Sequence, residues 1–359
     1  MSSASDAIFK QAYDYHTMTP DQQRAASLAR KLDEIQAIDE GRARILSPGE
    51  AREAMAAAAE GIQAAKRNSS GRTKYFFFPN NPLAKSLVYD TNFNPARNGA
   101  FCALIDTFLV TEGRPVTEVE FRDLWLQKIF SRGLIAEGWY SPPPFGAAVL
   151  FGRNDDPARI SYTRLRYEEF WPRSENVVDW KSGFMYAYCS PVHKETGIIG
   201  DMSVCLYFGE DERLRAHFIN AYRATAELLE QLPKVSNSKE LFEKSNSVFQ
   251  KYNLANNIDS MNDPLNNNVG HTFPSIGKID ADSLTDEQKD QLSGARIFIN
   301  GGEPLEFTDG MQFTIEPQLV STLDSSLPKV TFHYVAKKVP EGYRLCNIIN
   351  ILSAKYRLI

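Results

Sequence analysis

One short stretch near the end of the chain decides the fold, and it reads Gly310-Met311-Gln312-Phe313-Thr314-Ile315-Glu316-Pro317. Its centre is apolar and β-prone, a glutamate closes it, and a proline prevents the backbone from donating further to a strand ladder. A carboxylate at the end of a buried strand is held rigidly, as a metal ligand must be. The stretch therefore predicts a strand that presents Glu316.

Two other segments carry residues of the same chemical type. Gly200-Asp201 opens the apolar run at 202–209, and Gly270-His271 lies in a turn-rich segment. An aspartate, a histidine and a glutamate supply oxygen and nitrogen donors that suit a divalent transition-metal ion. We expect Asp201, His271 and Glu316 to converge on one metal ion.

The order and the flanking residues of these three motifs resemble the pita-bread superfamily of methionine aminopeptidase, aminopeptidase P, prolidase and creatinase. The resemblance covers roughly residues 90–350. It implies an α+β fold with a curved antiparallel sheet flanked by two helix pairs. It also implies a metal cage of two aspartates on one hairpin, a histidine and two late glutamates, which together hold two ions.

Two of those five positions differ in this chain. The resemblance places two aspartates eleven residues apart, but counting back eleven from Asp201 gives Ser190. The last glutamate should precede a histidine near the final long strand, and Phe332 stands there, followed by His333. The three residues that are kept serve mainly one of the two ions. We therefore predict at most one ion (Mn, Fe, Co or Zn), with His333 available to complete its site.

Two basic residues stand where the peptidases of this superfamily carry histidines. Arg159 ends the segment 152–159, and Lys278 follows His271 by seven residues. These departures argue against peptide-bond cleavage by the family mechanism. They also predict cations near the pocket, which can hold a substrate carboxylate or phosphate. His271 is expected to act as a general base, because its ordinary pKa lies near neutrality.

Composition narrows the class of protein. The 359 residues are 43% hydrophobic and 24% charged, with a formal net charge of −5, which is a globular composition without a general attraction to nucleic acid or acidic membranes. No apolar run approaches the ~18 residues that span a bilayer. Four cysteines without CxxC spacing indicate reduced thiols, so we expect a cytoplasmic protein.

The pattern along the chain predicts an N-terminal helical arm at 1–74 and a pita-bread domain at 75–359. Helices are expected at 96–111, from about 118 with Thr117 as N-cap and Glu120 in a capping box, at 214–232 and at 238–252. Residues 143–210 are β-like, 253–268 form a polar loop, and short strands follow from 297. Such an arm is typical of a dimer element, so a homodimer is expected.

Three functions are consistent with these residues. The leading hypothesis is a metallopeptidase-like enzyme that hydrolyses a small molecule, or carries out related C–N or C–O chemistry, as creatinase does within the superfamily. The first alternative is a catalytically silent module that binds a peptide or protein, and the second is an aminopeptidase with altered ligands. The expected partner is a small molecule or short peptide, and metal content together with the effect of His271→Ala discriminates among the three.

Overall fold

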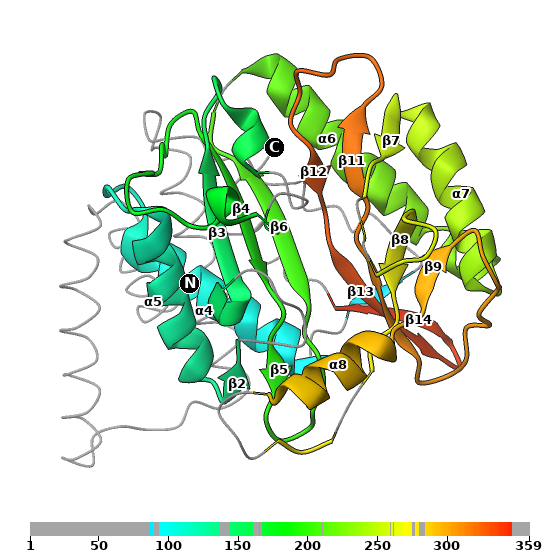
Figure 1. The fold of residues 1–359 in the computed structure, drawn as a ribbon. Helices are drawn as coiled ribbons and strands as arrows, with labels where there is room; N and C mark the ends of the chain where they lie inside the picture. Colours follow the sequence, from blue (N-terminus) through cyan, green and yellow to red (C-terminus); the bar gives the residue numbers. More distant parts are fainter. Residues whose placement is uncertain are drawn as a thin grey trace, which may run out of the picture. The chain divides into compact units, whose positions relative to one another are not determined.

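The computed structural model describes residues 87–89, 93–136, 144–160, 165, 167–209, 211–258, 260, 262–274, 277–279 and 284–346. Helices and mostly antiparallel strands alternate without a βαβ period (Figure 1). The predicted α+β class is therefore confirmed. The predicted helical arm at 1–74 lies outside the described residues. Among the described residues, no helix has the length and apolar character that crossing a bilayer requires.

The helices form where the sequence supplies caps. They are α4 (Pro95–Thr111), α5 (Glu118–Phe130), α6 (Glu212–Leu229), α7 (Ser238–Lys251) and α8 (Asp286–Gly294). Thr117 caps α5 as predicted, because its side chain accepts a hydrogen bond from the backbone N–H of Glu120. The helices pack as the pairs α4–α5 and α6–α7, which lie beside different groups of strands in Figure 1.

The strands are short. They are β1 (Val88–Tyr89), β2 (Leu134–Ile135), β3 (Ala147–Gly152), β4 (Phe184–Cys189), β5 (Val192–His193), β6 (Met202–Tyr207), β7 (Leu254–Asn256), β8 (Asn268–His271), β9 (Phe298–Asn300), β10 (Gln312–Ile315), β11 (Gln318–Ser321), β12 (Val330–Thr331), β13 (Tyr334–Val339) and β14 (Gly342–Cys346).

The sheet β3-β4-β6 is antiparallel throughout, and all its residues are buried. Cys189 pairs with Met202 and Tyr188 with Ser203. Continuing this register beyond the strand ends places Ser190 opposite Asp201. Ser190 and Asp201, which are eleven residues apart in the chain, therefore face each other across this β-hairpin.

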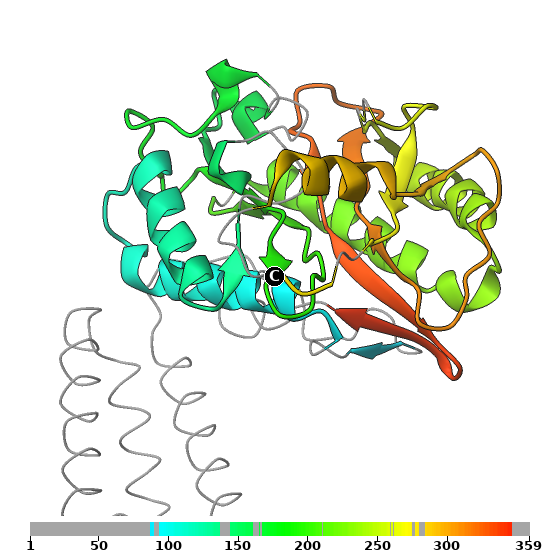
Figure 2. The same cartoon turned by 60° about the horizontal axis from the view of Figure 1, so that its bottom comes forward.

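The remaining strands form the sheets β1-β14-β13-β10, β12-β11-β7, β8-β9 and β2-β5. Figure 2 shows β1 lying along the edge of the β13–β14 hairpin, where it pairs in parallel with β14. Two isolated bridges join these sheets to their neighbours: Val204 pairs with Phe332, and Thr272 pairs with Phe313. The ends of β6, β8 and β10 and the junction of β12 with β13 therefore meet in one region.

Two parts of the predicted pattern differ in the structure. The segment 253–268, expected to be a loop, contains β7 and the first residue of β8. The helix α8 lies where no element was expected, and Thr285 caps it with Gln288 in a capping box. Only Leu292 of α8 is buried, so the helix lacks the apolar stripe by which amphipathic helices are recognised.

A buried ion pair fixes the start of α5 against β3. The carboxylate of Glu118 is fully buried and accepts hydrogen bonds from the backbone N–H groups of Phe151 (2.7 Å) and Arg173 (2.8 Å). It also forms a bidentate pair with Arg159, at 2.5 and 3.2 Å. Removing one partner of such a pair leaves the other charge buried without compensation.

We expect Glu118→Gln to lower the free energy of unfolding by about 3–5 kcal/mol, measured by urea denaturation. The matched control is Asp155→Asn, which breaks the exposed pair with Arg153 and should leave the midpoint unchanged. A loss below about 1 kcal/mol for Glu118→Gln would show that the pair does not hold the helix.

Candidate metal centre

The first side chains of the site come from the β4–β6 hairpin. Asp201 directly precedes β6 and is buried, and its Oδ1 accepts a hydrogen bond from the hydroxyl of Ser190 at 3.3 Å. The hydroxyl of Tyr188 makes a short hydrogen bond with Ser190 in turn. Ser190 stands where the resemblance implies an aspartate. It therefore offers Asp201 a hydroxyl group, which is bonded in turn to a second hydroxyl group.

His271 ends β8 and is brought close to β10 by the residue before it. A Cβ on Gly270 would lie 2.0 Å from the carbonyl oxygen of Thr314, so only glycine allows this approach. The backbone N–H of His271 then donates to Oγ1 of Thr314 at 2.8 Å. Its Nδ1 lies 3.0 Å from the carbonyl of Thr272, which orients Nε2 toward the acids.

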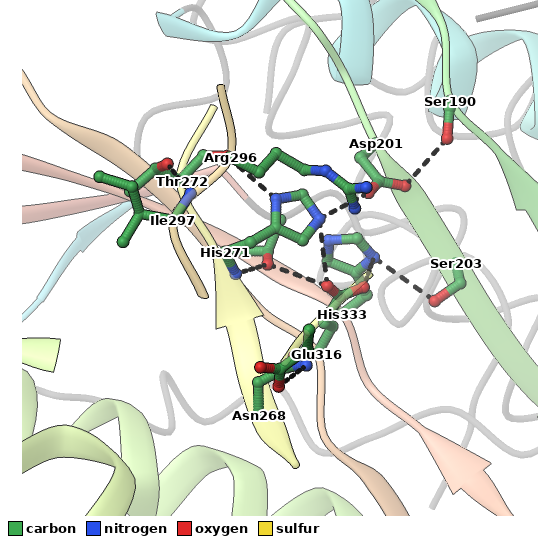
Figure 3. Close-up of polar contacts among 12 residues, drawn as sticks. Ser190, Asp201, Ser203, Asn268, His271, Thr272, Arg296, Ile297, Glu316 and His333 are labelled. Atoms are coloured by element: carbon green, nitrogen blue, oxygen red, sulfur yellow. Dashed lines mark hydrogen bonds and ion pairs between the residues drawn. The ribbon is translucent and has the colours of Figure 1, made fainter. Parts of the chain in front are cut away.

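Glu316 follows β10 as the sequence predicted, and its carboxylate joins the other two residues. Nε2 of His271 lies 3.3 Å from Oδ2 of Asp201 and 3.3 Å from Oε1 of Glu316. Thr314 donates a hydrogen bond to the same Oε1 at 3.1 Å. The three residues singled out from their separate motifs therefore converge on one point (Figure 3).

His333 joins the cluster from the junction between β12 and β13. Its Nδ1 lies 3.7 Å from Oε2 of Glu316 and 3.4 Å from the hydroxyl of Ser203. The preceding Phe332 has its ring in edge contact with Tyr222 of α6. Of this pair, the structure therefore brings the imidazole, and not the phenyl ring, to the acids.

Burial gives the cluster unusual acid–base properties. The side chains of Asp201, His271 and His333 are at most 5% exposed, whereas that of Glu316 is 17% exposed and is the most open. Burial raises the pKa of Glu316 to about 7, with His271 opposing the shift and Asp201 adding to it. Burial also holds the pKa of His333 well below its ordinary value, and the charge of Arg97 acts in the same direction.

The donor set fits a divalent metal ion. One ligand atom from each of Asp201, Glu316 and His333 lies within 4.8 Å of the others, and His271 contacts both carboxylates. The Nε2 atom of His333 is buried and makes no hydrogen bond within the described part of the chain. Two carboxylates and two imidazoles are the donors that Mn, Fe, Co and Zn accept.

Of the two cations expected near the pocket, Arg159 is engaged by another group, and a pocket role for Lys278 stays a prediction. Arg159 is buried and bound by Glu118 and by the carbonyl groups of Glu169 and Trp171, so its guanidinium has an internal role. Lys278 is exposed. The physical reason is local: Arg159 pairs with a buried acid on α5, which no motif spacing reveals.

A different arginine carries positive charge toward the cluster. Figure 3 shows the side chain of Arg296 directed toward His271 and Asp201. Its guanidinium stacks on Phe298 at 5.2 Å and donates to Ser293. Arg296 lies two residues before the start of β9, and nothing in its flanking sequence marks it as part of a site.

No protein-family model and no curated protein matches the sequence. Solved structures with a similar fold include the dipeptidase PepE from Mycobacterium ulcerans, at 13% identity and a TM-score of 0.49 over 73% of this chain. The methionine aminopeptidase from Rickettsia prowazekii is 17% identical, with a TM-score of 0.48 over 69% of this chain and 92% of its own. The prolidase from Pyrococcus furiosus is 13% identical, with a TM-score of 0.47 over 74% of this chain and 66% of its own.

The chain spans 60% of the length of the dipeptidase that it matches. These solved structures are of pita-bread enzymes, the superfamily whose motifs this sequence resembles. At these identities the likeness concerns the fold alone.

Proposed function

We propose that Asp201, His271, Glu316 and His333 bind one divalent metal ion, and that the chain is a metallopeptidase-like enzyme that hydrolyses a small molecule or short peptide. The observation that carries this proposal is the meeting of two carboxylates and two imidazoles in one buried cluster. Buried acids of like charge are costly unless a cation compensates them, and a divalent ion is such a cation.

A single ion is supported by what surrounds the cluster. Ser190, which stands where the resemblance implies a second aspartate, places a hydroxyl group beside Asp201, and the hydroxyl of Tyr188 is bonded to Ser190. Hydroxyl groups do not supply the negative charge that a second divalent ion requires. Phe332 packs against Tyr222 and offers no ligand atom.

The residues of the cluster suit hydrolysis. A bound divalent ion would supply Lewis acidity. Glu316 is the most exposed of the four side chains, so its carboxylate is the one most open to a substrate. His271 is fixed by Thr272 on one nitrogen and by the acids on the other, so its orientation is set before a substrate binds.

The charge of Arg296 indicates the substrate class. A guanidinium directed toward the cluster favours a substrate with a carboxylate or phosphate group. Its stacking on Phe298 restricts its position. The rings of Phe273 and Phe298 make T-shaped contacts with the ring of His271, with centroids 5.8 and 6.1 Å apart. An aromatic wall beside one cation suits a small anionic molecule with an apolar part.

Metal titration of a matched pair of histidine variants tests the metal centre. Isothermal titration calorimetry with Mn²⁺ should give one equivalent for the wild-type protein and an affinity at least about 100-fold weaker for His333→Gln, since loss of outer-shell partners alone costs about 10–100-fold. The control is His217→Gln, another buried histidine, which is bound to the carbonyl of Pro328. It should bind Mn²⁺ as the wild-type protein does.

The other functions predict different results. Two equivalents of Mn²⁺, together with release of N-terminal residues from peptides, would indicate an aminopeptidase with altered ligands. No binding, with a His271→Ala variant that still binds a peptide tightly, would indicate a silent binding module. Either result would contradict the single-ion enzyme.

A further inference from the structure

A fully buried arginine connects two residues of the cluster through their backbones. Arg97 lies in the first turn of α4, and its side chain is inaccessible to solvent. One terminal nitrogen donates to the carbonyl oxygen of Asp201 and the other donates to the carbonyl oxygen of His333. These two residues come from β-segments far apart in the chain, and both offer ligand atoms to the site.

The guanidinium is held in place from several sides. It lies over the ring of Phe101, with 5.0 Å to the ring centroid. Its Nε makes no hydrogen bond within the described residues, so the two carbonyl groups set the direction of the planar fork. Asp201 and Glu316 provide a negative field that compensates part of the cost of burying the charge.

The start of α4 is itself attached to the segment before Asp201. Asn94 accepts a hydrogen bond from the backbone N–H of Arg97 at 3.0 Å and donates to the carbonyl of Ile199 at 2.9 Å. A Cβ on Gly200 would lie 2.2 Å from the backbone nitrogen of Arg97, so glycine permits this contact. The arginine is therefore anchored at its backbone as well as at its guanidinium.

We propose that Arg97 is a positioning residue: its fork fixes the separation of Asp201 and His333, so that both side chains reach the same ion. The proposal rests on the proposed metal centre. A lysine keeps the charge but presents one ammonium group in place of a planar fork, so it cannot hold both carbonyl groups in the same geometry. The separation of the two ligands should then relax.

The test compares two buried arginines that both bind backbone carbonyl groups. Arg97→Lys should weaken Mn²⁺ binding about tenfold or more in calorimetric titration, as is typical when a group that orients a ligand is lost. Arg159→Lys alters another buried arginine, which holds Glu118 and the carbonyls of Glu169 and Trp171. It should lower the melting temperature and leave Mn²⁺ affinity within about twofold of wild type, well below that loss.

Amide hydrogen exchange of the metal-free proteins gives a readout that does not depend on the ion. Exchange at 201–204 and 332–334 should rise in Arg97→Lys and not in Arg159→Lys. If the wild-type protein binds no Mn²⁺ but this difference appears, the metal centre is wrong and the positioning role stands. If affinity and local exchange respond equally in both variants, Arg97 acts through general stability and the proposal is overturned.

A variant that does not fold also decides the question. Arg97→Gln is the second variant, because it keeps one donor nitrogen and has less bulk to accommodate. If neither Arg97 variant folds while Arg159→Lys does, the arginine is needed for the fold itself. That result would refute a role confined to the two ligands.

Discussion

Glu316→Gln is expected to weaken binding of the divalent ion strongly and, at the same time, to stabilise the metal-free protein. The substitution removes a ligand carboxylate and should weaken Mn²⁺ binding by at least about 100-fold. It also removes a charge that the buried site disfavours, since burial raises the pKa of Glu316 to about 7. A residue kept only for packing would not give these opposite effects.

The sign of the stability effect depends on pH. The folded-state pKa of Glu316 is above its ordinary value of 4.5, so the stability that the protonated carboxyl contributes is complete below 4.5 and is lost as pH rises through about 7. The wild-type protein should therefore have about the same free energy of unfolding as Glu316→Gln at pH 4.5. At pH 8 its free energy of unfolding should be lower, by at most about 3 kcal/mol.

Urea denaturation of the chelator-treated proteins at the two pH values measures this difference. The control is Glu303→Gln, which changes an exposed glutamate and should shift neither affinity nor stability. Equal stability of wild type and Glu316→Gln at pH 8 would show that burial does not disfavour the charged form of Glu316.

Metal affinity should fall steeply in mild acid. A ligand carboxylate must lose its proton before it can bind an ion, so below a pKa of about 7 the affinity for Mn²⁺ should decrease about tenfold per pH unit. Above that pKa the affinity should level off as far as this group is concerned. His333 should not add to the slope, because burial keeps its pKa well below the ordinary value.

Calorimetric titration at half-unit steps between pH 5.5 and 8 measures this dependence. A slope of at least about one proton below pH 7 is the expected profile. A flat profile across this range would mean that Glu316 either does not bind the ion or ionises as an ordinary exposed glutamate does.

Local sequence signals predicted most of the helices and the strand at Gln312–Ile315. Thr117 and Asn237 cap their helices through side chains whose hydrogen bonds depend only on nearby residues. The helix α8 was missed although Thr285 and Gln288 form a capping box, because few apolar positions follow it. The short strand β7 owes its existence to pairing with β11, which no local pattern contains.

Site residues could be predicted where the neighbouring residues form a recognisable motif. They could not be predicted where the role depends on contacts with residues far away in the chain. Asp201 directly precedes a strand, His271 ends one and Glu316 directly follows one, each with a distinctive neighbour, and the structure brings them together. The roles of Arg97 and Arg296 depend on groups far away in the sequence. Arg159 was misplaced for the same reason, since its partner Glu118 belongs to another helix.

The pair Phe332 and His333 shows a further limit of prediction from the sequence. One residue of register decides which side chain faces the acids, and the pair lies between β12 and β13, where an isolated bridge with Val204 replaces a regular ladder. Alternation along the strand therefore cannot be read from the sequence at this point. Only the contacts of Phe332 with Tyr222 and of His333 with Glu316 settle it.

A crystal structure of the protein grown with Mn²⁺, with anomalous scattering recorded for the metal, tests the central claim most directly. We predict one anomalous peak in the core of the domain, in contact with Asp201, His271, Glu316 and His333. A pair of peaks beside Asp201, or a cluster whose imidazoles and carboxylates bind only one another in saturating Mn²⁺, would contradict the account.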